Sequence, residues 1–471
     1  MNHSLGSSAN PVRIAAIGSG PSAFYAAETL FKLPGISVHV DMFDRLPVPF
    51  GLVRGGVAPD HQKIKSVVKV YEKIAQNPGF RFFGNVQIGT NLQVQDLAAH
   101  YHMVIWAIGC EADLKLGAPG EDLSGVHSAT EFVGWYNGHP DFRSCKFDLA
   151  NAERVALIGN GNVAMDVARI LLCDPEHLAS TDIAEHALAT LKKSRVREVV
   201  LLGRRGPAQA AFSPKELEEI TALPGVDVVV QPKEAQLDEL SLRWLEQEGA
   251  RSAQRNVKLV EEIAGRGEGT AARKLRCRFL VSPVELIGSD GRLTQVRLQH
   301  AVLGPDASGT PRPKPLDSFE TLKADLVFKA IGYRGRPLAG VPFDEKKGIV
   351  LNAEGRVLEK AGGAPLAGHY AVGWCKRGPT GLIGTNSADS KATVEAMLAD
   401  LTAGKVMRPT GNDIRALLEQ RSVDFVSWQD WLLLDAWEQE QGKAKGKVRL
   451  KQPSIEALMA AVRELRQRGA A

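Results

Sequence analysis

At 471 residues the chain is too long for one compact core, and its length suggests two or three domains. Apolar residues make up 44% of the chain and charged residues 24%, the proportions of a soluble globular protein. The net charge of +4 is too small to indicate a nucleic-acid partner, and the longest apolar runs are far shorter than the about 20 residues that an integral membrane segment needs.

The N-terminus and the cysteines favour a reducing compartment. Residues 1–13 show neither an apolar stretch nor an arginine-rich amphipathic pattern, so we expect no signal or transit peptide. The five cysteines are scattered without a C-x-x-C pair, which argues against a zinc ribbon, an iron–sulfur cluster within the chain or a dithiol redox centre. We therefore predict a cytoplasmic protein without a metal site.

The first predicted elements are a strand and a helix joined by a glycine-rich turn, in residues 12–31. In "GSGPSA", Gly18 permits a tight turn, Gly20 lets a pyrophosphate approach the backbone, and Ala23 lets the helix pack on the strand. The next predicted strand ends in Asp44, an acid about 20 residues past the turn that can hydrogen-bond a ribose. These features predict a dinucleotide site, against the alternative of a glycine turn without a function.

A single amphipathic helix is predicted from "APDHQKIKSVVKVYEKIA". Asp60 is its expected N-cap, and His61 then falls in the first turn. An exposed first-turn histidine is the plainer interpretation of His61, and a functional histidine is the alternative. The apolar face of this helix comprises Ile64, Val67, Val68, Tyr71 and Ile74.

A second strand, turn and helix are predicted in residues 154–171. "RVALIGNGNVAMDVARIL" repeats the first pattern, with Gly159 and Gly161 in the turn. The strand that follows ends in Arg204 and Arg205 instead of an acid. Paired guanidinium groups bind a 2′-phosphate through charge-assisted hydrogen bonds, whereas a carboxylate would repel it. The second site is therefore predicted to bind NADP(H), unless the two arginines merely lie on a solvated turn.

Two further segments follow the second glycine turn. Ser213, Pro214 and Glu216 form the pattern of a helix N-terminus with a capping box, and from these residues alone a structural role and a functional role of Glu216 both stay open. Residues 232–275 are polar and charged, and we expect them to be a surface excursion of the second nucleotide-binding domain.

Two dinucleotide sites imply two cofactors that exchange electrons. The first site fits FAD or NAD, and FAD is the better inference because hydride transfer between two nicotinamides in one chain would need an unusual arrangement. Similar segments, "AIGCEADLKLGAPG" from residue 107 and "AIGYRGRPLAG" from residue 330, mark the places where the chain leaves one domain for the other. We predict an α/β fold with two Rossmann-like domains, the NADP domain inserted into the FAD domain. The expected sections are 1–110 and 333–471 for the FAD domain and 111–332 for the NADP domain.

A glycine-rich loop from Gly378 to Gly384 precedes the next predicted helix, which should begin near Ser387 with Asn386 or Ser387 as N-cap. Its backbone N–H groups and the positive end of the helix would favour a reduced, anionic flavin. By sequence alone Trp374 could equally be a core aromatic residue. The C-terminal tail predicts two helices separated by a Gly/Lys-rich linker.

Long motifs of this chain resemble the adrenodoxin-reductase type of ferredoxin–NADP⁺ reductase, over nearly the whole length. The resemblance implies an FAD domain interrupted by an NADP domain, and electron transfer between NADPH and a small iron–sulfur protein. The motifs are "GSGPSAFYAAE", "RLPVPFGLVRGGVAPDHQKIKSV", "FFGNVQIG", "TEFVGWYNGHPD", "IGNGNVAMDVARIL", "GRRGPAQAAFSPKEL" and "VGWCKRGPTGLIGTNSADSKATVEAML".

The resemblance also implies roles for residues of the first domain. It places the FAD pyrophosphate at the first turn and the adenosine ribose at Asp44, where many relatives have glutamate. The residues expected at the pyrophosphate are Gly18, Gly20, Ser22 and Ala23. Those expected to contact the flavin are Leu52, Ile88, Trp374, Gly381, Leu382 and Ile383, with Gly381 also next to the nicotinamide.

For the second domain, the resemblance implies a pyrophosphate site at the second turn and a 2′-phosphate site at Arg204 and Arg205. It also implies that His61 and Glu216 lie near the nicotinamide and handle a proton or position the ring. Both residues are candidate catalytic residues. The residues expected at the NADP pyrophosphate are Asn160, Gly161, Asn162 and Val163.

The expected reaction passes hydride from NADPH to flavin N5 and then single electrons to an external carrier, a ferredoxin or a flavodoxin. A basic rim could dock this acidic carrier, although charge runs are more often solvated faces. The rim would comprise Lys63, Lys65, Lys69, Lys73, Arg195 and Arg197.

Three alternatives to this function stay open. The reduced flavoprotein could pass electrons to a quinone or oxygen, it could hydroxylate a small substrate, or the chain could be a non-catalytic NADPH-sensing module. The sequence does not fix the oligomeric state, for which a monomer is the expectation.

Overall fold

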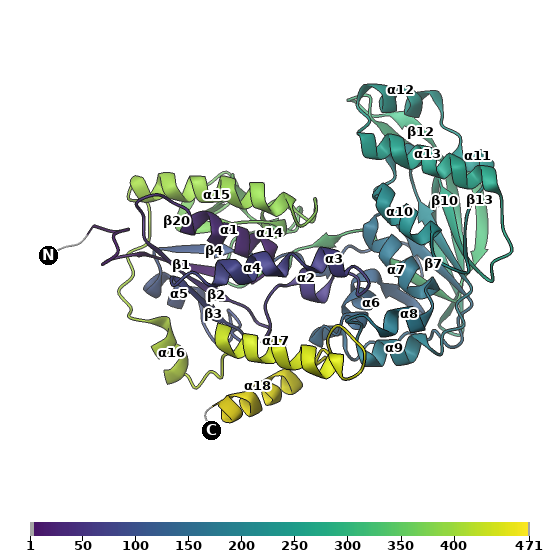
Figure 1. Ribbon diagram of the computed structural model, residues 1–471. Coiled ribbons are helices and arrows are strands. Elements are labelled where there is room, and N and C mark those ends of the chain that lie inside the picture. The colour runs from purple at the N-terminus through teal and green to yellow at the C-terminus, as the bar shows by residue number, and fades with distance from the viewer. Residues whose placement is uncertain (1–3, 470–471) are drawn as a thin grey trace. The chain divides into compact units, whose positions relative to one another are not determined.

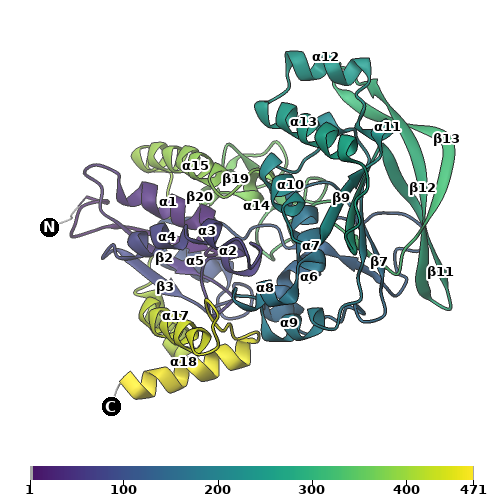
Figure 2. The same cartoon turned by 45° about the vertical axis from the view of Figure 1, so that its right-hand side comes forward.

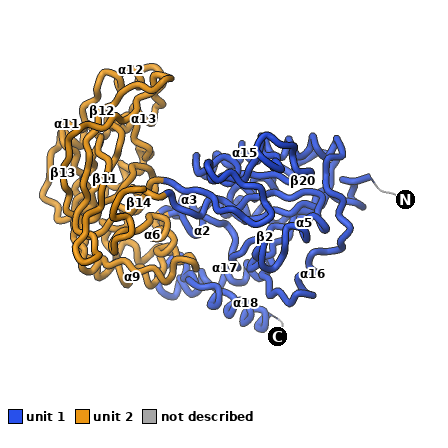
Figure 3. The backbone as a smooth tube through the Cα atoms, turned by 180° about the vertical axis from the view of Figure 1, so that it is seen from behind, with its two compact units in different colours: residues 1–57, 61–114, 332–471 blue, residues 58–60, 115–331 orange. Residues whose placement is uncertain are grey.

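The computed structural model describes residues 4–469, and its element order is shown in Figure 1. The chain forms two compact units, coloured separately in Figure 3. Unit 1 comprises residues 1–57, 61–114 and 332–471, and unit 2 comprises residues 58–60 and 115–331. Each unit is an α/β structure on a mainly or wholly parallel sheet, and most of unit 2 is inserted within the chain of unit 1. The predicted fold class is confirmed.

Unit 1 is built on a seven-stranded sheet in the order β18-β19-β20-β4-β1-β2-β3. The five strands from β20 to β3 are parallel, and the two at the other edge are antiparallel. The strands span β1 Val12–Ile17, β2 Val38–Phe43, β3 Phe80–Phe83, β4 Met103–Trp106, β18 Asn352–Ala353, β19 Arg356–Leu358 and β20 Pro365–Ala371.

Residues of β1 alternate between the two faces of this sheet, as expected for a strand buried on both sides. Ile14 and Ala16 face one core, to which α1, α4, α15, α17 and α18 contribute, whereas Ala15 and Ile17 face a second core with α5 and α16. Helices α1 and α15 lie side by side in Figures 1 and 2. The helices of unit 1 span α1 Pro21–Phe31, α2 Leu52–Gly55, α3 Gln62–Lys65, α4 Val68–Ala75, α5 Val94–His100, α14 Trp374–Arg377, α15 Thr385–Thr402, α16 Ile414–Gln420, α17 Trp428–Lys443 and α18 Ile455–Gly469.

The two helices predicted for the C-terminal tail are confirmed as α17 and α18, which pack against each other (Figure 2). Trp431 and Leu434 of α17 and Leu458 and Val462 of α18 are buried in the first core of unit 1. No helix in the described part of the chain is long and apolar enough to cross a membrane.

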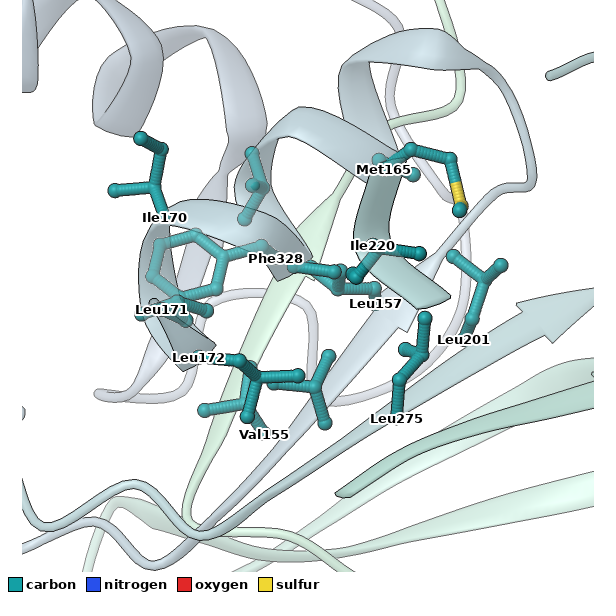
Figure 4. Close-up of a cluster of buried hydrophobic side chains, with 14 of the residues drawn as sticks. Val155, Leu157, Met165, Ile170, Leu171, Leu172, Leu201, Ile220, Leu275 and Phe328 are labelled. Atoms are coloured by element: carbon teal, nitrogen blue, oxygen red, sulfur yellow. The ribbon is translucent and has the colours of Figure 1, made fainter. Parts of the chain in front are cut away.

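Unit 2 is built on a six-stranded parallel sheet in the order β6-β14-β7-β8-β10-β9, together with a three-stranded antiparallel sheet, β11-β12-β13. Val155 and Leu157 of β7 face the larger core, part of which is shown in Figure 4, whereas Ala156 and Ile158 face the core shared with the antiparallel sheet. The strands span β6 Val126–Ser128, β7 Arg154–Ile158, β8 Glu198–Gly203, β9 Val226–Val230, β10 Arg273–Phe279, β11 Val281–Ser289, β12 Arg292–Pro305, β13 Pro311–Lys323 and β14 Leu326–Lys329. The helices span α6 Ala129–Tyr136, α7 Asn162–Leu172, α8 Pro175–Ala179, α9 Glu185–Leu191, α10 Pro214–Thr221, α11 Pro232–Ala235, α12 Glu239–Gln247 and α13 Arg251–Arg266, with short 3-10 helices at Pro140–Phe142 and Pro207–Gln209.

The prediction that segment 232–275 is a surface excursion was wrong, because parts of the segment belong to the core and the main sheet of unit 2. Val257, Val260 and Ile263 of α13 are buried, and β10 lies between β8 and β9 inside the main sheet. The charged residues of α13 conceal its apolar face because they occupy the opposite side of the same helix.

The single helix predicted over residues 58–75 is also wrong. The structure has two short helices, α3 and α4, separated at Ser66 and Val67. His61 and not Asp60 is the N-cap of α3, and the carboxylate of Asp60 instead pairs with Arg169. A partner more than a hundred residues away cannot be inferred from local periodicity.

The two similar exit segments pair with each other. Short strands β5 (Ala112–Asp113) and β15 (Tyr333–Arg334) form an antiparallel ribbon, and Leu114 N donates to Gly332 O at 3.1 Å. A second small ribbon, β16 (Phe343–Asp344) with β17 (Ile349–Val350), follows in unit 1. The chain therefore passes from unit 1 to unit 2 and returns at adjacent points of unit 1.

Candidate functional site

The first glycine turn is shaped by its contact with the end of β4. Gly18 has φ +101°, and a Cβ atom on it would lie 2.4 Å from the carbonyl oxygen of Ala107. A Cβ on Gly20 would meet nothing within 4 Å. Gly18 is thus required by the fold, whereas Gly20 leaves open space at the N-terminus of α1, where an anion is stabilised.

The second turn repeats this arrangement. Gly159 has φ +122°, and a Cβ on it would lie 2.3 Å from the carbonyl oxygen of Ala330, whereas a Cβ on Gly161 would be unobstructed. Ala107 and Ala330 begin the two A-I-G segments of the sequence. Each segment therefore completes one glycine turn, which explains why the chain carries the segment twice.

Asp44 at the end of β2 is bound to the first turn. Ser19 donates from N at 3.0 Å and from Oγ at 2.5 Å to its Oδ2, and Leu46 N donates to Oδ1 at 2.9 Å. Burial raises the pKa of Asp44 above its usual value, and the hydrogen bonds from Ser19 and Leu46 oppose this rise. The acid predicted to hold a ribose is thus fixed in orientation by the turn that would hold the pyrophosphate.

Arg204 and Arg205 follow β8 and carry unbalanced charge. Neither guanidinium makes an ion pair with any residue that the structure describes, and Arg204 is exposed. Burial, together with the positive charges of Arg204 and Arg312, lowers the pKa of Arg205. Two arginines without a carboxylate partner at the end of this strand fit a phosphate group.

The second turn also offers a donor without an acceptor. The Nδ2 atom of Asn160 is buried and has no hydrogen-bond partner within residues 4–469. Asn162 differs, because its Oδ1 accepts from Ser213 N at 2.7 Å and so ties the turn to α10, while Val163 packs against the larger core of unit 2. Asn160, Gly161 and the arginines fit a bound NADP(H) better than the side chains of Asn162 and Val163 do.

The segment before α2 approaches the first turn closely. Phe50 has φ +84°, a strained conformation for a bulky residue, and its N–H donates to Ser19 O at 3.0 Å. A Cβ on Gly51 would lie 3.2 Å from the Cα of Gly20. Leu52 follows with 46% of its surface exposed. Sequence reasoning singled out Leu52 but missed Phe50 and Gly51, whose only local signal is the P-F-G tripeptide.

The loop that precedes α15 is held by Asp389. Its Oδ2 accepts from Gly373 N at 2.6 Å, and its carboxylate pairs with Lys376 at 3.0 Å and Arg377 at 3.2 Å. A Cβ on Gly373, at φ +70°, would lie 2.5 Å from Ser22 Oγ. The loop is therefore anchored to α15 and lies against the start of α1.

Helix α15 begins earlier than predicted. It starts at Thr385 with Gly384 as N-cap, and Asn386 lies in its first turn, where its Oδ1 accepts from Arg377 Nη2 at 2.9 Å. The prediction of Asn386 or Ser387 as N-cap was wrong because the loop already turns at Leu382, whose carbonyl accepts from Thr385 N at 3.1 Å.

The residues predicted to contact the flavin differ in exposure. Leu382 is 68% exposed, Gly381 has φ +81°, and Ile383 packs partly on the first core of unit 1. Trp374 stacks on Tyr333 at 5.7 Å between ring centroids and is half-buried. Two large exposed apolar residues, Leu52 and Leu382, lie in segments that both adjoin the first glycine turn or its helix, as a flavin site requires.

Three of the predicted FAD-binding residues have buried side chains. Ala23 is fully buried against the first core, and Ser22 is 8% exposed with its carbonyl accepting from Ser390 Oγ at 2.9 Å. Ile88 is 5% exposed in the second core of unit 1. At these three positions a ligand could contact the backbone but not the buried side chain.

Glu216 is part of a buried charge cluster around Arg169 of α7. Arg169 is 3% exposed and donates to Glu216 Oε2 at 2.9 Å, to Asp166 at 2.6 Å and to both oxygens of Asp60 at 2.6 and 3.2 Å. Burial opposes its charge, but these carboxylates raise the pKa of Arg169 above its usual value. Sequence reasoning missed Arg169, which lies on the mainly apolar helix α7.

Ser213 is the N-cap of α10 as predicted, since its Oγ accepts from Glu216 N at 3.4 Å. The predicted capping box is only half present. The side chain of Glu216 pairs with Arg169, and Ser213 N donates to Asn162 instead. The interpretation of Glu216 as a capping residue was therefore wrong.

Two predicted surface residues are buried. His61 is 9% exposed, so its interpretation as an exposed first-turn histidine was wrong. Lys65 is 8% exposed and cannot belong to a docking rim. Lys63, Lys69, Lys73, Arg195 and Arg197 are exposed, as a docking role would require.

Comparisons with known proteins identify the family. No protein-family profile matches the chain. The NADPH-ferredoxin reductase FprA of Mycobacterium tuberculosis is 43% identical over 460 residues, covering 95% of this chain and 98% of that protein. The chain belongs to this reductase family. The resemblance to the adrenodoxin-reductase type is likewise confirmed, because the mitochondrial NADPH:adrenodoxin oxidoreductase of Arabidopsis thaliana is 40% identical over 466 residues, 96% of each chain.

A solved structure supports this membership. The structure of M. tuberculosis FprA in complex with NADPH matches with a TM-score of 0.90 at 42% identity, covering 96% of this chain and 100% of that one. A probable ferredoxin/ferredoxin–NADP reductase of Mycobacterium bovis is 42% identical over 459 residues, 96% of this chain and 76% of that protein.

Proposed function

We propose that the protein is an FAD-containing oxidoreductase that passes electrons between NADPH and a ferredoxin. The relatives that match nearly the whole chain are named as oxidoreductases of NADPH with ferredoxin or with adrenodoxin. The observation that carries the proposal is the contrast between the two turns. One is followed by Asp44, bound to Ser19, and the other by Arg204 and Arg205, which make no ion pair with a described residue. A family fold alone would not separate the two cofactors.

Unit 1 would hold FAD and unit 2 would hold NADPH, in sections close to those predicted from the sequence. Bound FAD would accept two electrons as a hydride and release them one at a time, which links NADPH to a one-electron carrier. Within unit 1, the open space at Gly20 and the N-terminus of α1 would receive the pyrophosphate, and Asp44 the ribose. The flavin ring of the bound FAD would cover the exposed side chains of Leu52 and Leu382.

Within unit 2, Asn160 and Gly161 would contact the NADP pyrophosphate, and Arg204 with Arg205 the 2′-phosphate. Arg169 holds the carboxylate of Glu216 in one orientation, which suits a residue that positions the nicotinamide. His61 stays a candidate for the same task. The proton-handling role of both residues is part of the proposal.

The physiological partner would be a ferredoxin, and a flavodoxin is the alternative carrier. Lys63, Lys69 and Lys73 give α3 and α4 an exposed positive character that suits an acidic carrier. We also propose a cytoplasmic location and a monomer. Light scattering of the purified holoprotein tests the second of these directly.

The alternatives make different predictions. A reductase of quinone or oxygen would not need ferredoxin, a hydroxylase would consume oxygen with a small substrate, and an NADPH sensor would bind the nucleotide without oxidising it. A sensor has no use for an exposed apolar pair at a flavin site, so the exposure of Leu52 and Leu382 favours the enzyme.

The test is anaerobic reduction followed by ferredoxin-dependent turnover. The visible spectrum of the purified protein should show flavin, which NADPH should bleach more readily than NADH, and cytochrome c reduction should then require ferredoxin. Arg204→Ala with Arg205→Ala should remove most of the preference for NADPH, whereas Arg297→Ala, on the antiparallel sheet of unit 2, should not. Bleaching without ferredoxin dependence would refute the proposed acceptor, and unchanged nucleotide selectivity would refute the 2′-phosphate site.

A further inference from the structure

A hairpin of the antiparallel sheet in unit 2 lies beside Arg204 and Arg205. Leu280 N donates to Arg205 O at 3.3 Å, and Ala301 N of β12 donates to Leu280 O at 2.8 Å. A Cβ on Gly206 would lie 3.6 Å from Leu303 Cδ1, further along β12. The end of the β12–β13 hairpin is thus adjacent to the turn that carries both arginines.

Arg312 is the charged residue that this hairpin brings to the turn. It stands at the start of β13, opposite Gly304 of β12. Its Nε donates to Asp306 Oδ2 at 3.0 Å, and Asp306 also accepts from Ser308 N at 2.9 Å and Thr310 N at 3.0 Å. Hydrogen bonds from Ser308 and Arg312 lower the pKa of Asp306, so this tether is charged at neutral pH.

Only one edge of the Arg312 guanidinium is used. Among the residues that the structure describes, neither Nη group of Arg312 has an acceptor, and its side chain is 54% exposed. The ion pair with Asp306 therefore fixes the side chain and leaves both Nη groups, with four N–H donors, for another group. A guanidinium held in this way loses less conformational freedom when it binds an anion.

Arg204, Arg205 and Arg312 carry like charges that act on one another. Burial lowers the pKa of Arg205, and the positive charges of Arg204 and Arg312 lower it further. Arg204 and Arg205 have no ion-pair partner among the described residues, and an incoming anion would relieve the repulsion between their guanidinium groups. A phosphate with nearly two negative charges would interact with all three guanidinium groups.

We propose that Arg312 is a third cation of the 2′-phosphate site and a determinant of the preference for NADPH over NADH. This inference rests on the proposed function and adds to it a residue from a separate sheet. The two arginines after β8 supply part of the site, and the β12–β13 hairpin supplies the rest.

The test is calorimetric binding to the holoprotein of two adenosine fragments, 2′,5′-ADP and 5′-AMP, which differ in the 2′-phosphate. Arg312→Ala should weaken binding of 2′,5′-ADP by about three- to tenfold and leave 5′-AMP unchanged. Arg312→Lys should recover part of the loss, because it restores the charge. Arg297→Ala is the matched control, since Arg297 lies on the same sheet, is 46% exposed and pairs with Glu285.

Three outcomes separate the inference from the proposed function. Wild-type binding of 2′,5′-ADP by Arg312→Ala, with a loss in the Arg204→Ala and Arg205→Ala double variant, would overturn the role of Arg312 and leave the proposed site intact. A lysine variant as weak as the alanine variant would also overturn it, because hairpin geometry and not charge would then matter. Unchanged binding in the double variant as well would mean that the proposed site itself is misplaced.

Discussion

At the residue scale, the two glycines of each turn have separate tasks. Gly18 and Gly159 have positive φ angles and face the carbonyl oxygens of Ala107 and Ala330, whereas Gly20 and Gly161 face open space. The first pair is needed to fold, and the second leaves room for a ligand. Sequence patterns predict both pairs equally and cannot distinguish them.

A pair of single substitutions should separate these tasks. Gly18→Ala should destabilise the protein by at least about 2 kcal/mol, because φ +101° disfavours alanine and a Cβ would lie 2.4 Å from Ala107 O. Gly20→Ala should cost less than about 1 kcal/mol but weaken FAD binding. Urea unfolding of the apoprotein and fluorescence titration with FAD measure the two effects. Equal losses of stability in Gly18→Ala and Gly20→Ala would show that a Cβ atom at Gly20 is not accommodated without strain.

The buried cluster of unit 2 gives a second prediction at this scale. Arg169→Leu should destabilise unit 2 by about 3–5 kcal/mol, because it leaves Asp60, Asp166 and Glu216 without their common cation. Arg255→Leu, which removes an arginine paired with Glu218 but 49% exposed, should cost less than about 1 kcal/mol. Urea unfolding compares the two variants, and similar losses would contradict the assignment of Arg169 as a structural centre.

At the element scale, one ion pair connects the segment after β5 with the end of β14. Lys329 donates to Glu121 Oε1 at 2.5 Å, and Leu116 N and Gly117 N donate to the same carboxylate at 2.8 and 2.9 Å. Burial would raise the pKa of Glu121, but the bonds from Lys329 and the two backbone groups lower it to about 2. The carboxylate thus stabilises the fold in its charged form.

This lowered pKa predicts a pH-dependent difference between the wild type and Glu121→Gln. The depressed value means that the stabilisation is complete above the usual pKa near 4.5 and is lost as the pH falls toward 2. We expect the variant to be less stable by about 1 kcal/mol at pH 7 and the gap to close in that window. Urea unfolding between pH 7 and pH 3 measures it, with Glu285→Gln, a surface pair, as control. A constant gap would contradict the charged role of Glu121.

Elements whose pattern is local were predicted well, and those with distant partners were not. The two strand–turn–helix units and helices α17 and α18 follow from glycine spacing and apolar periodicity. The break between α3 and α4, and the pairing of Asp60 with Arg169, depend on partners far along the chain. Asp389 was not predicted for the same reason, because it lies in α15 and anchors the loop at Gly373 sixteen residues earlier.

At the scale of the whole molecule, each unit has its own cores. Among residues 4–469, two clusters of buried apolar residues belong to unit 1 and two to unit 2. A ligand that binds one unit should therefore slow the local unfolding of that unit more than that of the other. Protection arises because bound ligand adds its binding free energy to the stability of the state that holds it.

Hydrogen exchange of the holoprotein should show this selectivity. With 2′,5′-ADP at about 100 times its dissociation constant, amides of the second turn and of Arg204 to Gly206 should exchange more slowly, by up to about 2.7 kcal/mol in opening free energy. Amides of residues 12–23 should not change. Protection of the first turn instead would assign NADPH to unit 1 and reverse the proposed arrangement.

The chain order of the strands also sets an order of completion during synthesis. The six-stranded sheet of unit 2 has all its strands once β14 ends at Lys329, and Ala330 then closes the turn at Gly159. The sheet of unit 1 still lacks β18, β19 and β20, and the start of α1 still lacks Gly373 and Ser390, which lie against Ser22. Because domains fold as units while the chain emerges from the ribosome, the inserted unit can fold first. The unit that begins the chain is thus the last to be completed.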